Sequence, residues 1–299
     1  RMGKERMMLN GINIDKWNSL RFGLVLSGGG AKGAYEAGAI KAMNEMDVSE
    51  KVYGVSGTSV GALNTLVFAM DNASLMESLW ENIGLMTVAA PKAMDGDSRA
   101  IKDIVGRLHI TAQLQGGGEG AVFTQNSLRA LIRKSCDFEK IRAHRAKLFA
   151  CAYDINERRV KYFELKKLSD DDMTDAVLAS AAIPRVYDPV EIDGHKFADG
   201  GINDPAYGIK NSDVTPLSPL QDEGYDIILV IHLREQESLD IDHIGSTRLI
   251  HIYPSKPLEQ IKGSGTMNFT RSAIRERFNM GYADMYIALG KLLMSIVKE

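Results

Sequence analysis

The chain has 299 residues, 44% of them apolar, and nearly balanced charges that leave a formal net charge of -3. This composition is ordinary for a globular protein and gives no global electrostatic attraction to nucleic acid, so we expect no nucleic-acid partner. The two cysteines, Cys136 and Cys151, form no C-x-x-C pair. The sequence therefore suggests neither a disulfide framework nor a zinc site, and it fits a reducing compartment.

The N-terminal region carries no strong targeting signal. Its apolar run, residues 7–9, is shorter than the roughly 7–15 apolar residues of a signal peptide. No stretch reaches the roughly 20 apolar residues that a membrane-crossing helix needs. We expect a cytoplasmic protein that at most contacts a membrane surface peripherally.

The first part of the chain predicts two strand–helix units. Residues 22–30 form an apolar run that ends in glycines, and residues 31–46 follow with helical spacing of apolar side chains. Residues 52–56 then read as a strand and residues 60–70 as an apolar helix. Two such units in succession predict an α/β fold with a mainly parallel central sheet.

Residues 87–127 break this pattern, because prolines and glycines interrupt any regular spacing. Long loops inside compact domains are often active-site lids, and a connector is an equally good interpretation. Further on, we expect a helix at residues 173–182 and a C-terminal helix or helix pair at residues 268–297. We expect strands at residues 147–153, 159–165, 196–199, 227–233 and 248–253. No linker or repeat divides the chain, so we predict a single domain over residues 1–299.

The sharpest motif is the Gly-Thr-Ser-Val-Gly sequence of residues 57–61, which lies between a predicted strand and a predicted helix. In that context a G-x-S-x-G motif is typical of a nucleophile elbow, in which Gly57 and Gly61 permit a tight turn that exposes Ser59. The Val60 N–H and the positive end of the helix would then lie near the reacting oxygen. The alternative is a buried serine in a turn of small residues.

Residues 28–33, Gly-Gly-Gly-Ala-Lys-Gly, also match the G-x-G-x-x-G pattern of a dinucleotide loop. A nucleotide-binding unit would need an acidic residue at the end of the second strand, where this chain has the Ser59 motif. The loop therefore favours an oxyanion hole, with backbone N–H donors from Gly28, Gly29 and Gly30. A packing turn and a non-catalytic phosphate- or nucleotide-binding module remain alternatives.

A third motif, Asp199-Gly200-Gly201, follows a short predicted strand. An acidic residue before two glycines is usually a turn. Together with the first two motifs, however, it places a carboxylate on a loop at a strand end, where the active-site groups of α/β sheets gather.

These motifs, with the Ala-Ser-Ala-Ala-Ile-Pro sequence of residues 179–184, resemble the patatin-like phospholipase family, in the family's order and from about residue 22 to residue 205. The resemblance implies a three-layer α/β/α fold that cleaves acyl esters of phospholipids or lysophospholipids without a cofactor. It implies a catalytic dyad of Ser59 and Asp199 and a basic loop position at Lys32. The residues it implies as loop support are Lys32, Gly33, Gly57, Gly61, Gly200 and Gly201. An esterase or thioesterase for soluble acyl groups would share this site.

A triad is the competing design, because an aspartate with a pKa near 3.9 is a poor base for serine unless burial raises it. Candidate histidines are His195, His232, His243 and His251. The predicted strand and turn positions of these histidines favour structural roles, so we expect the dyad. No cluster of His, Asp and Glu has the spacing of metal ligands, so we expect no metal. The sequence leaves the oligomeric state open.

Two segments suggest lipid contact. One is a cationic stretch within residues 92–147, and the other is the apolar stripe of the C-terminal helix. For each we favour the structural alternative, a solvated helix face and a face packed on the domain core respectively. The stretch comprises Arg129, Arg133, Lys134, Lys140, Arg142 and Arg145; the stripe comprises Ile274, Phe278, Tyr282, Met285, Leu289, Leu292 and Ile296.

Overall fold

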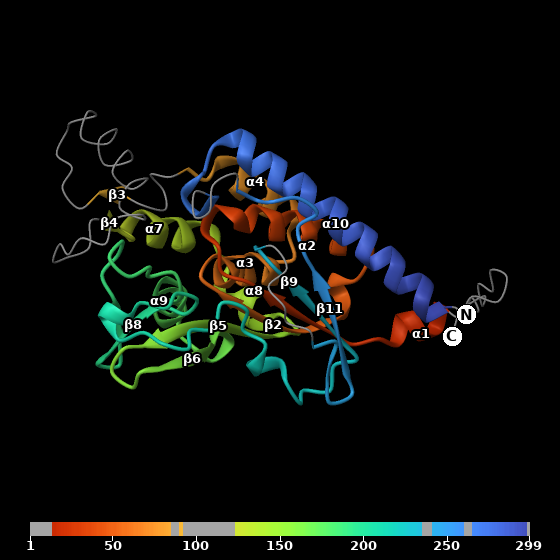
Figure 1. Ribbon diagram of the computed structural model, residues 1–299, viewed down its shortest axis with the longest axis horizontal. Coiled ribbons are helices and arrows are strands. Elements are labelled where there is room, and N and C mark those ends of the chain that lie inside the picture. Colours follow the sequence, from red (N-terminus) through yellow and green to blue (C-terminus); the bar gives the residue numbers. More distant parts are fainter. Residues whose placement is uncertain (1–13, 85–89, 92–122, 235–240, 260–264, 298–299) are drawn as a thin grey trace.

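The computed structural model describes residues 14–84, 90–91, 123–234, 241–259 and 265–297 (Figure 1). Its centre is a nine-stranded sheet in the order β10-β11-β9-β1-β2-β5-β8-β7, with β6 paired to β5. The strands are β1 (Phe22–Leu26), β2 (Val52–Thr58), β5 (Lys147–Asp154), β6 (Arg159–Glu164), β7 (Val190–Ile192), β8 (His195–Asp199), β9 (Ile227–Ile231), β10 (His243–Ile244) and β11 (Thr247–Ile252).

The sheet is parallel in its middle and antiparallel toward its edges. Strands β11, β9, β1, β2 and β5 run parallel to their neighbours in this series. Strands β6 and β8 pair antiparallel with β5, β7 pairs antiparallel with β8, and β10 pairs antiparallel with β11. The predicted mainly parallel α/β sheet is therefore confirmed, with an antiparallel extension at each edge.

Helices cover one face of the sheet (Figure 1). On this face, Leu24 and Leu26 of β1 join the main core together with side chains of the helices. On the other face, Val25 packs with Tyr225 and with Leu220 of the 3-10 helix η5 (Ser218–Leu220). The three-layer class is confirmed, with the α-helices as one outer layer and the segment that carries η5 as the other. The α-helices are α1 (Ile14–Ser19), α2 (Ala34–Glu45), α3 (Val60–Ala69), α4 (Ala73–Asn82), α7 (Asn126–Ser135), α8 (Phe138–Ala143), α9 (Asp170–Ser180) and α10 (Arg271–Val297).

The C-terminal segment forms one helix, α10, rather than a pair, and it packs along α2 (Figure 1). Glycines let the two backbones approach closely. A Cβ added at Gly38 would lie 1.9 Å from the Phe278 carbonyl oxygen, and one added at Gly281 would lie 1.9 Å from that of Tyr35. Most of the predicted apolar stripe of α10 is buried. The expectation that this face packs on the domain's own core is confirmed.

Helix α10 also amends the sequence expectation about membrane-crossing segments. Among the described residues, it is long and apolar enough to cross a bilayer by length and composition, with a mean hydropathy of 1.2. A packed core helix passes the same test, and the buried Arg277 hydrogen-bonds to three backbone carbonyls of this domain. We therefore account for α10 as a helix of the domain.

The predicted insertion at residues 87–127 is described at its two ends. There β3 (Ala90–Pro91) pairs antiparallel with β4 (Phe123–Thr124), so the chain returns to the place from which it departs. The lid interpretation concerns residues that lie outside the described ones.

We predict that Gly281→Ala lowers the free energy of unfolding, although alanine is the better helix former. The added methyl group would force α10 away from α2, and overpacking of this kind typically costs about 1–3 kcal/mol. Gly290→Ala is the matched control on the same helix, because no atom lies within 4 Å of its added Cβ. It should stabilise by about 0.5–1 kcal/mol. Urea unfolding of both variants tests this, and equal effects would contradict the close contact.

Candidate active site

Ser59 lies in a strained turn between β2 and α3. Its backbone has φ 57° and ψ −119°, a conformation that is uncommon for a residue with a side chain and often marks functional sites. A Cβ at Gly57 would lie 2.2 Å from the Gly61 carbonyl oxygen, and one at Gly61 would lie 2.3 Å from that of Leu26. Positions 57 and 61 therefore require glycine, because a neighbouring backbone carbonyl group occupies the space of a side chain.

Ser180, the last residue of α9, supports this turn. The Ser59 N–H donates to Ser180 Oγ at 2.8 Å, and Ser180 Oγ donates to the Cys151 carbonyl oxygen at 2.5 Å. Two residues later, the Ala182 carbonyl oxygen accepts the Asp199 N–H at 2.9 Å. The segment that follows α9 thus connects the Ser59 turn to Asp199, a role that its sequence alone does not indicate.

Asp199 is 1% exposed, at the end of β8. Its Oδ1 accepts the Gly201 N–H at 2.8 Å, while its buried Oδ2 has no hydrogen-bond partner among the described residues. Burial raises the pKa of Asp199 from 3.8 to about 6, and the Ser59 hydroxyl and the Gly201 N–H lower it in part. The structure brings together the two residues that the sequence singles out, and it provides the raised pKa that a dyad requires.

The glycine loop lies beside Ser59, but its three glycines are not equivalent. The N–H of Gly28 donates to the Val214 carbonyl oxygen at 2.8 Å, so the sequence-based expectation that Gly28 is a free donor is wrong. The N–H groups of Gly29, Gly30 and Val60 have no acceptor among the described residues. Because Val60 begins α3, its N–H is one of the uncovered donors of a helix start.

The loop-support residues occupy tight positions. Lys32 is buried, and its Nζ lies 3.7 Å from Glu259 Oε2; burial lowers its pKa. A Cβ at Gly33 would lie 2.4 Å from Val60 Cγ2, and one at Gly200 would lie 2.4 Å from the Cys151 carbonyl oxygen. The three motifs are therefore packed directly against one another and against neighbouring strands.

Three of the four candidate histidines have partners elsewhere. His232 Nε2 lies 2.9 Å from His251 Nδ1, and His251 Nε2 lies 3.0 Å from the Ile241 carbonyl oxygen. His195 Nδ1 lies 2.8 Å from Asp154 Oδ2. Burial lowers the pKa of His232 to about 4. His243 is exposed in β10. None of the four histidines affects the pKa of Asp199.

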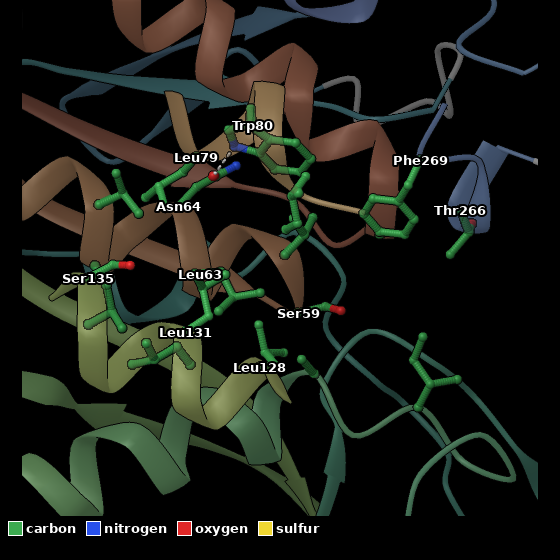
Figure 2. A pocket seen from close by; sticks show the side chains of 18 of the residues that line it. Ser59, Leu63, Asn64, Leu79, Trp80, Leu128, Leu131, Ser135, Thr266 and Phe269 are labelled. Carbon is green, nitrogen blue, oxygen red and sulfur yellow. Dashed lines mark hydrogen bonds between the residues drawn. The ribbon is translucent and has the colours of Figure 1, made fainter. Parts of the chain in front are cut away.

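An apolar pocket opens from Ser59 between α3, α4 and α7 (Figure 2). Its most polar wall is formed by Asn64 and Trp80, whose polar atoms are bonded to each other at 3.0 Å. The lining residues are Gly30, Ser59, Val60, Leu63, Asn64, Leu66, Val67, Leu79, Trp80, Ile83, Leu128, Leu131, Ile132, Ser135, Cys136, Ala181, Ile183, Tyr187, Thr266, Met267 and Phe269. The sequence did not indicate this pocket, because its walls come from helices far apart in the chain.

Asn64 also connects the helices that carry the two loops. Its Nδ2 donates to the Gly33 carbonyl oxygen at 3.1 Å and to Glu36 Oε2 at 2.8 Å. Glu36 is fully buried, and burial raises its pKa well above the ordinary value. Glu36 thus accepts a hydrogen bond from Asn64 at the junction of α2 and α3. Sequence reasoning missed this contact, although a glutamate within an otherwise apolar run was a signal for it.

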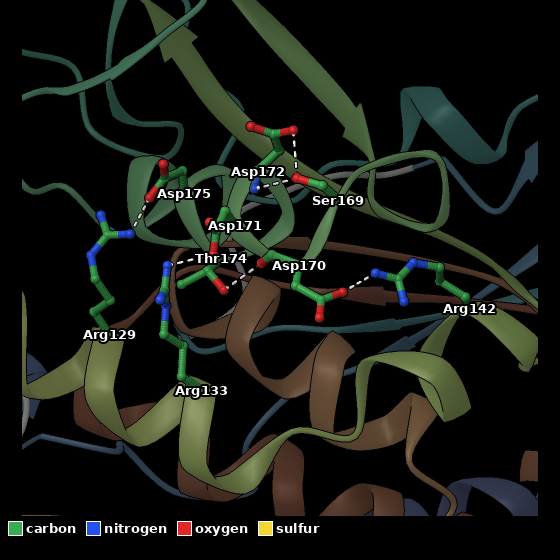
Figure 3. A network of polar contacts seen from close by, with 9 residues as sticks. All are labelled: Arg129, Arg133, Arg142, Ser169, Asp170, Asp171, Asp172, Thr174 and Asp175. Carbon is green, nitrogen blue, oxygen red and sulfur yellow. Dashed lines mark hydrogen bonds and ion pairs between the residues drawn. The ribbon is translucent and has the colours of Figure 1, made fainter.

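Half of the six cations of the cationic stretch are paired with aspartates of α9 (Figure 3). The pairs are Arg129 with Asp175, Arg133 with Asp171, and Arg142 with Asp170. They connect α7 and α8 to α9, so three of the six cations proposed for lipid attraction serve contacts within the domain. Within the described residues, no group of three or more His, Cys, Asp or Glu could hold a metal ion.

Known proteins are similar to this chain in sequence. The model of the family described as patatin-like phospholipase matches residues 24–207. A probable lipid hydrolase, 463L, of Invertebrate iridescent virus 6 is 23% identical over 60% of this chain and 59% of its own length. An uncharacterized NTE family protein of Mycobacterium bovis is 26% identical over 74% of this chain and 51% of its own length. The chain thus spans about half to three fifths of these curated relatives.

Two solved structures share the fold. VipD from Legionella pneumophila has a TM-score of 0.52 at 14% identity, over 91% of this chain and 67% of its own. Human GIVD cytosolic phospholipase A2, in complex with methyl gamma-linolenyl fluorophosphonate, has a TM-score of 0.51 at 13% identity, over 95% of this chain and 59% of its own. Fold and site define an α/β protein with a strained serine turn between β2 and α3, beside an apolar pocket. Since the family model covers more than half of the chain, the protein belongs to the patatin-like phospholipase family.

We predict that Asp199→Asn stabilises the protein at neutral and alkaline pH. The pKa of Asp199 in the folded state, about 6, exceeds the ordinary 3.8, so the wild type loses stability as pH rises through this window. An asparagine has no such cost, and the shift corresponds to about 3 kcal/mol at most. Urea unfolding should show the variant more stable at pH 8 and little different below pH 4. Equal stability at both pH values would contradict the raised pKa.

Proposed function

We propose that this protein is a lipid acyl hydrolase that uses a dyad of Ser59 and Asp199. The observation that carries the proposal is the buried Oδ2 of Asp199, which has no hydrogen-bond partner in the described part of the chain and lies near a serine on a strained elbow at the mouth of an apolar pocket. A buried carboxylate oxygen without a partner costs stability, so its retention is best explained by a proton that it accepts during turnover.

In this mechanism Asp199 takes the hydroxyl proton of Ser59 as Ser59 Oγ attacks the ester carbonyl. A pKa of about 6 leaves Asp199 ionised at neutral pH while making it a far better base than an ordinary aspartate. The N–H groups of Gly29, Gly30 and Val60 stabilise the oxyanion. The tetrahedral intermediate expels the alcohol, which takes the proton from Asp199. Water then hydrolyses the acyl-enzyme by the same steps and releases the fatty acid.

The pocket favours a fatty-acyl chain as the group transferred to Ser59. Among the described residues no charged side chain lines it, and its polar Asn64 and Trp80 atoms are already bonded to each other. An acyl chain would therefore gain hydrophobic burial without leaving polar groups unpaired. We propose phospholipids or lysophospholipids as substrates of a cytoplasmic enzyme that meets the membrane peripherally. Soluble esters or thioesters are the alternative.

We predict that Ser59→Ala and Asp199→Asn each lower fatty-acid release from mixed phospholipid vesicles at least about 10³-fold, as expected when members of one catalytic unit are removed. In the pH profile of wild-type kcat/KM, activity should fall toward low pH with a midpoint near pH 6, the pKa of Asp199; we call this fall the acid limb. Circular dichroism would establish that both variants are folded.

Substitution of His195, His232, His243 and His251 by Asn, one at a time, provides the control for this experiment. Each variant should retain most of the activity. Loss of activity in one of them, with Asp199→Asn still active, would replace the dyad by a triad. Hydrolysis of short soluble esters without release from vesicles would instead favour the esterase alternative.

We further predict that Ser135→Trp selectively reduces hydrolysis of long-chain esters. The pocket follows α3 from Ser59 to Val67, about 12 Å at the helical rise, and Ser135 lies at its far end (Figure 2). A bulky side chain there should lower kcat/KM for palmitoyl esters by roughly 10-fold or more, by analogy with the cost of overpacking. Butyryl esters should be hydrolysed as by the wild type.

The matched control is Lys134→Trp, one residue earlier on the exposed side of α7. It should leave the ratio of palmitoyl to butyryl hydrolysis unchanged. Unchanged chain-length preference in Ser135→Trp would show that the acyl chain lies elsewhere.

A further inference from the structure

Residues 213–215 hydrogen-bond to all three catalytic loops, although they lie outside the part of the chain that the family model matches. The Asp213 N–H donates to the Gly200 carbonyl oxygen at 2.7 Å, and the Asp213 carbonyl oxygen accepts Thr58 Oγ1 at 2.8 Å. The next residue, Val214, accepts the Gly28 N–H at 2.8 Å. One short segment thus contacts three parts of the site. These are the loop of residues 199–201 (the base loop), Thr58, which precedes Ser59, and the glycine loop of residues 28–30 (the oxyanion loop).

The side chain of Val214 fills the space between two of these loops. A Cβ added at Gly28 would lie 3.4 Å from Val214 Cγ2, and one added at Gly201 would lie 3.1 Å from the same methyl group. Thr215 continues the contact, since its Oγ1 lies 3.0 Å from Ser27 Oγ. The segment therefore defines the spacing between the oxyanion loop and the base loop by packing as well as by hydrogen bonds.

Asp213 is in turn held by the sheet. Tyr162 of β6 donates its hydroxyl to Asp213 Oδ2 at 2.6 Å, and the Thr215 N–H also donates to this carboxylate. Tyr162 is the register partner of Cys151 on β5. Cys151 is itself the register partner of Thr58 on β2. The Tyr162 hydroxyl therefore comes from β6, which is two strands away from the strand that ends in the Ser59 turn.

We propose that residues 213–215 are a positioning segment, secured by Tyr162, that sets the relative placement of Ser59, Asp199 and the oxyanion donors. The role rests on the proposed function, because it concerns the same site. It acts through the backbone: a shift of Asp213 moves Gly200, which follows Asp199, and a shift of Val214 moves Gly28, which precedes the free donors Gly29 and Gly30.

The segment also influences the proton affinity of the base. The Gly201 N–H lowers the pKa of Asp199, so displacement of the base loop weakens this hydrogen bond and raises that pKa. The other titratable groups that act electrostatically with Asp199 are Cys151 and Tyr187. Burial raises the pKa of each, so both stay neutral where Asp199 titrates.

The test is Tyr162→Phe, with Tyr153→Phe as the matched control. Tyr153 is a buried tyrosine of β5 whose hydroxyl bonds to Gly208 and Lys210, outside the positioning segment. Tyr162→Phe should lower kcat roughly 10- to 100-fold, the effect expected of small misplacements, with KM for a butyryl ester within about twofold. Its acid limb should move to higher pH. Tyr153→Phe should change neither kcat nor the acid limb.

Two further measurements keep the test decisive. Asp213→Asn retains an acceptor for Tyr162 and should keep more activity than Asp213→Ala, and Tyr162→Phe combined with Asp213→Ala should be no worse than Asp213→Ala alone. Amide hydrogen exchange should increase around Gly28 and Gly200 in Tyr162→Phe and not in Tyr153→Phe, whether or not an ester substrate is hydrolysed.

The positioning role would be overturned if Tyr162→Phe had the same kcat, the same acid limb of the pH profile and the same amide hydrogen exchange as the wild type. The proposed function would not be affected by that result. The positioning role would also be overturned if Tyr162→Phe lowered only the amount of folded protein and left the acid limb of the pH profile where it is in the wild type. That result would indicate a contribution to folding alone. An inactive wild type with the predicted exchange pattern would instead contradict the proposed function and retain the segment's structural effect.

Discussion

The proposed active site depends on one costly arrangement, a buried carboxylate with one oxygen that has no partner in the described part of the chain. Asp199 Oδ2 has no hydrogen-bond partner among the described residues, and burial alone would favour its protonated form. The Gly201 N–H and the Ser59 hydroxyl offset part of this cost without removing it. In the proposed mechanism this carboxylate is the base, and its raised pKa suits proton transfer near neutral pH.

The sheet brings the reacting groups together. Parallel neighbours β1 and β2 end at the same edge, so the glycine loop after β1 lies beside the Ser59 turn after β2. Along β5, Cys151 is paired with Thr58 and the next residue, Ala152, with Asp199. Since β8 runs antiparallel to β5, its C-terminal residue reaches the nucleophile from the opposite direction. Register alone thus places Asp199 next to Ser59.

Local patterns predicted the parts of this account that neighbours in sequence determine. The Gly-Thr-Ser-Val-Gly turn, the glycine loop and most strands follow from glycine positions and apolar spacing. Features that depend on distant residues could not be predicted: the Gly28 N–H is taken by Val214, and Ser180 supports the Ser59 turn. Helices α4 and α7, which wall the pocket, were not predicted because their apolar faces are short and their burial depends on packing against other helices.

The activation of Ser59 by Asp199 is tested most directly by peptide mass spectrometry of the protein after reaction with a long-chain alkyl fluorophosphonate, a reagent that modifies activated serines. A dyad of Ser59 and Asp199 predicts one adduct on the peptide that contains Ser59, formed with a rate that falls below pH 6 and formed much more slowly in Asp199→Asn. Labelling of Ser59 that is equally fast in Asp199→Asn, or labelling of a different serine, would contradict the claim that Asp199 activates Ser59.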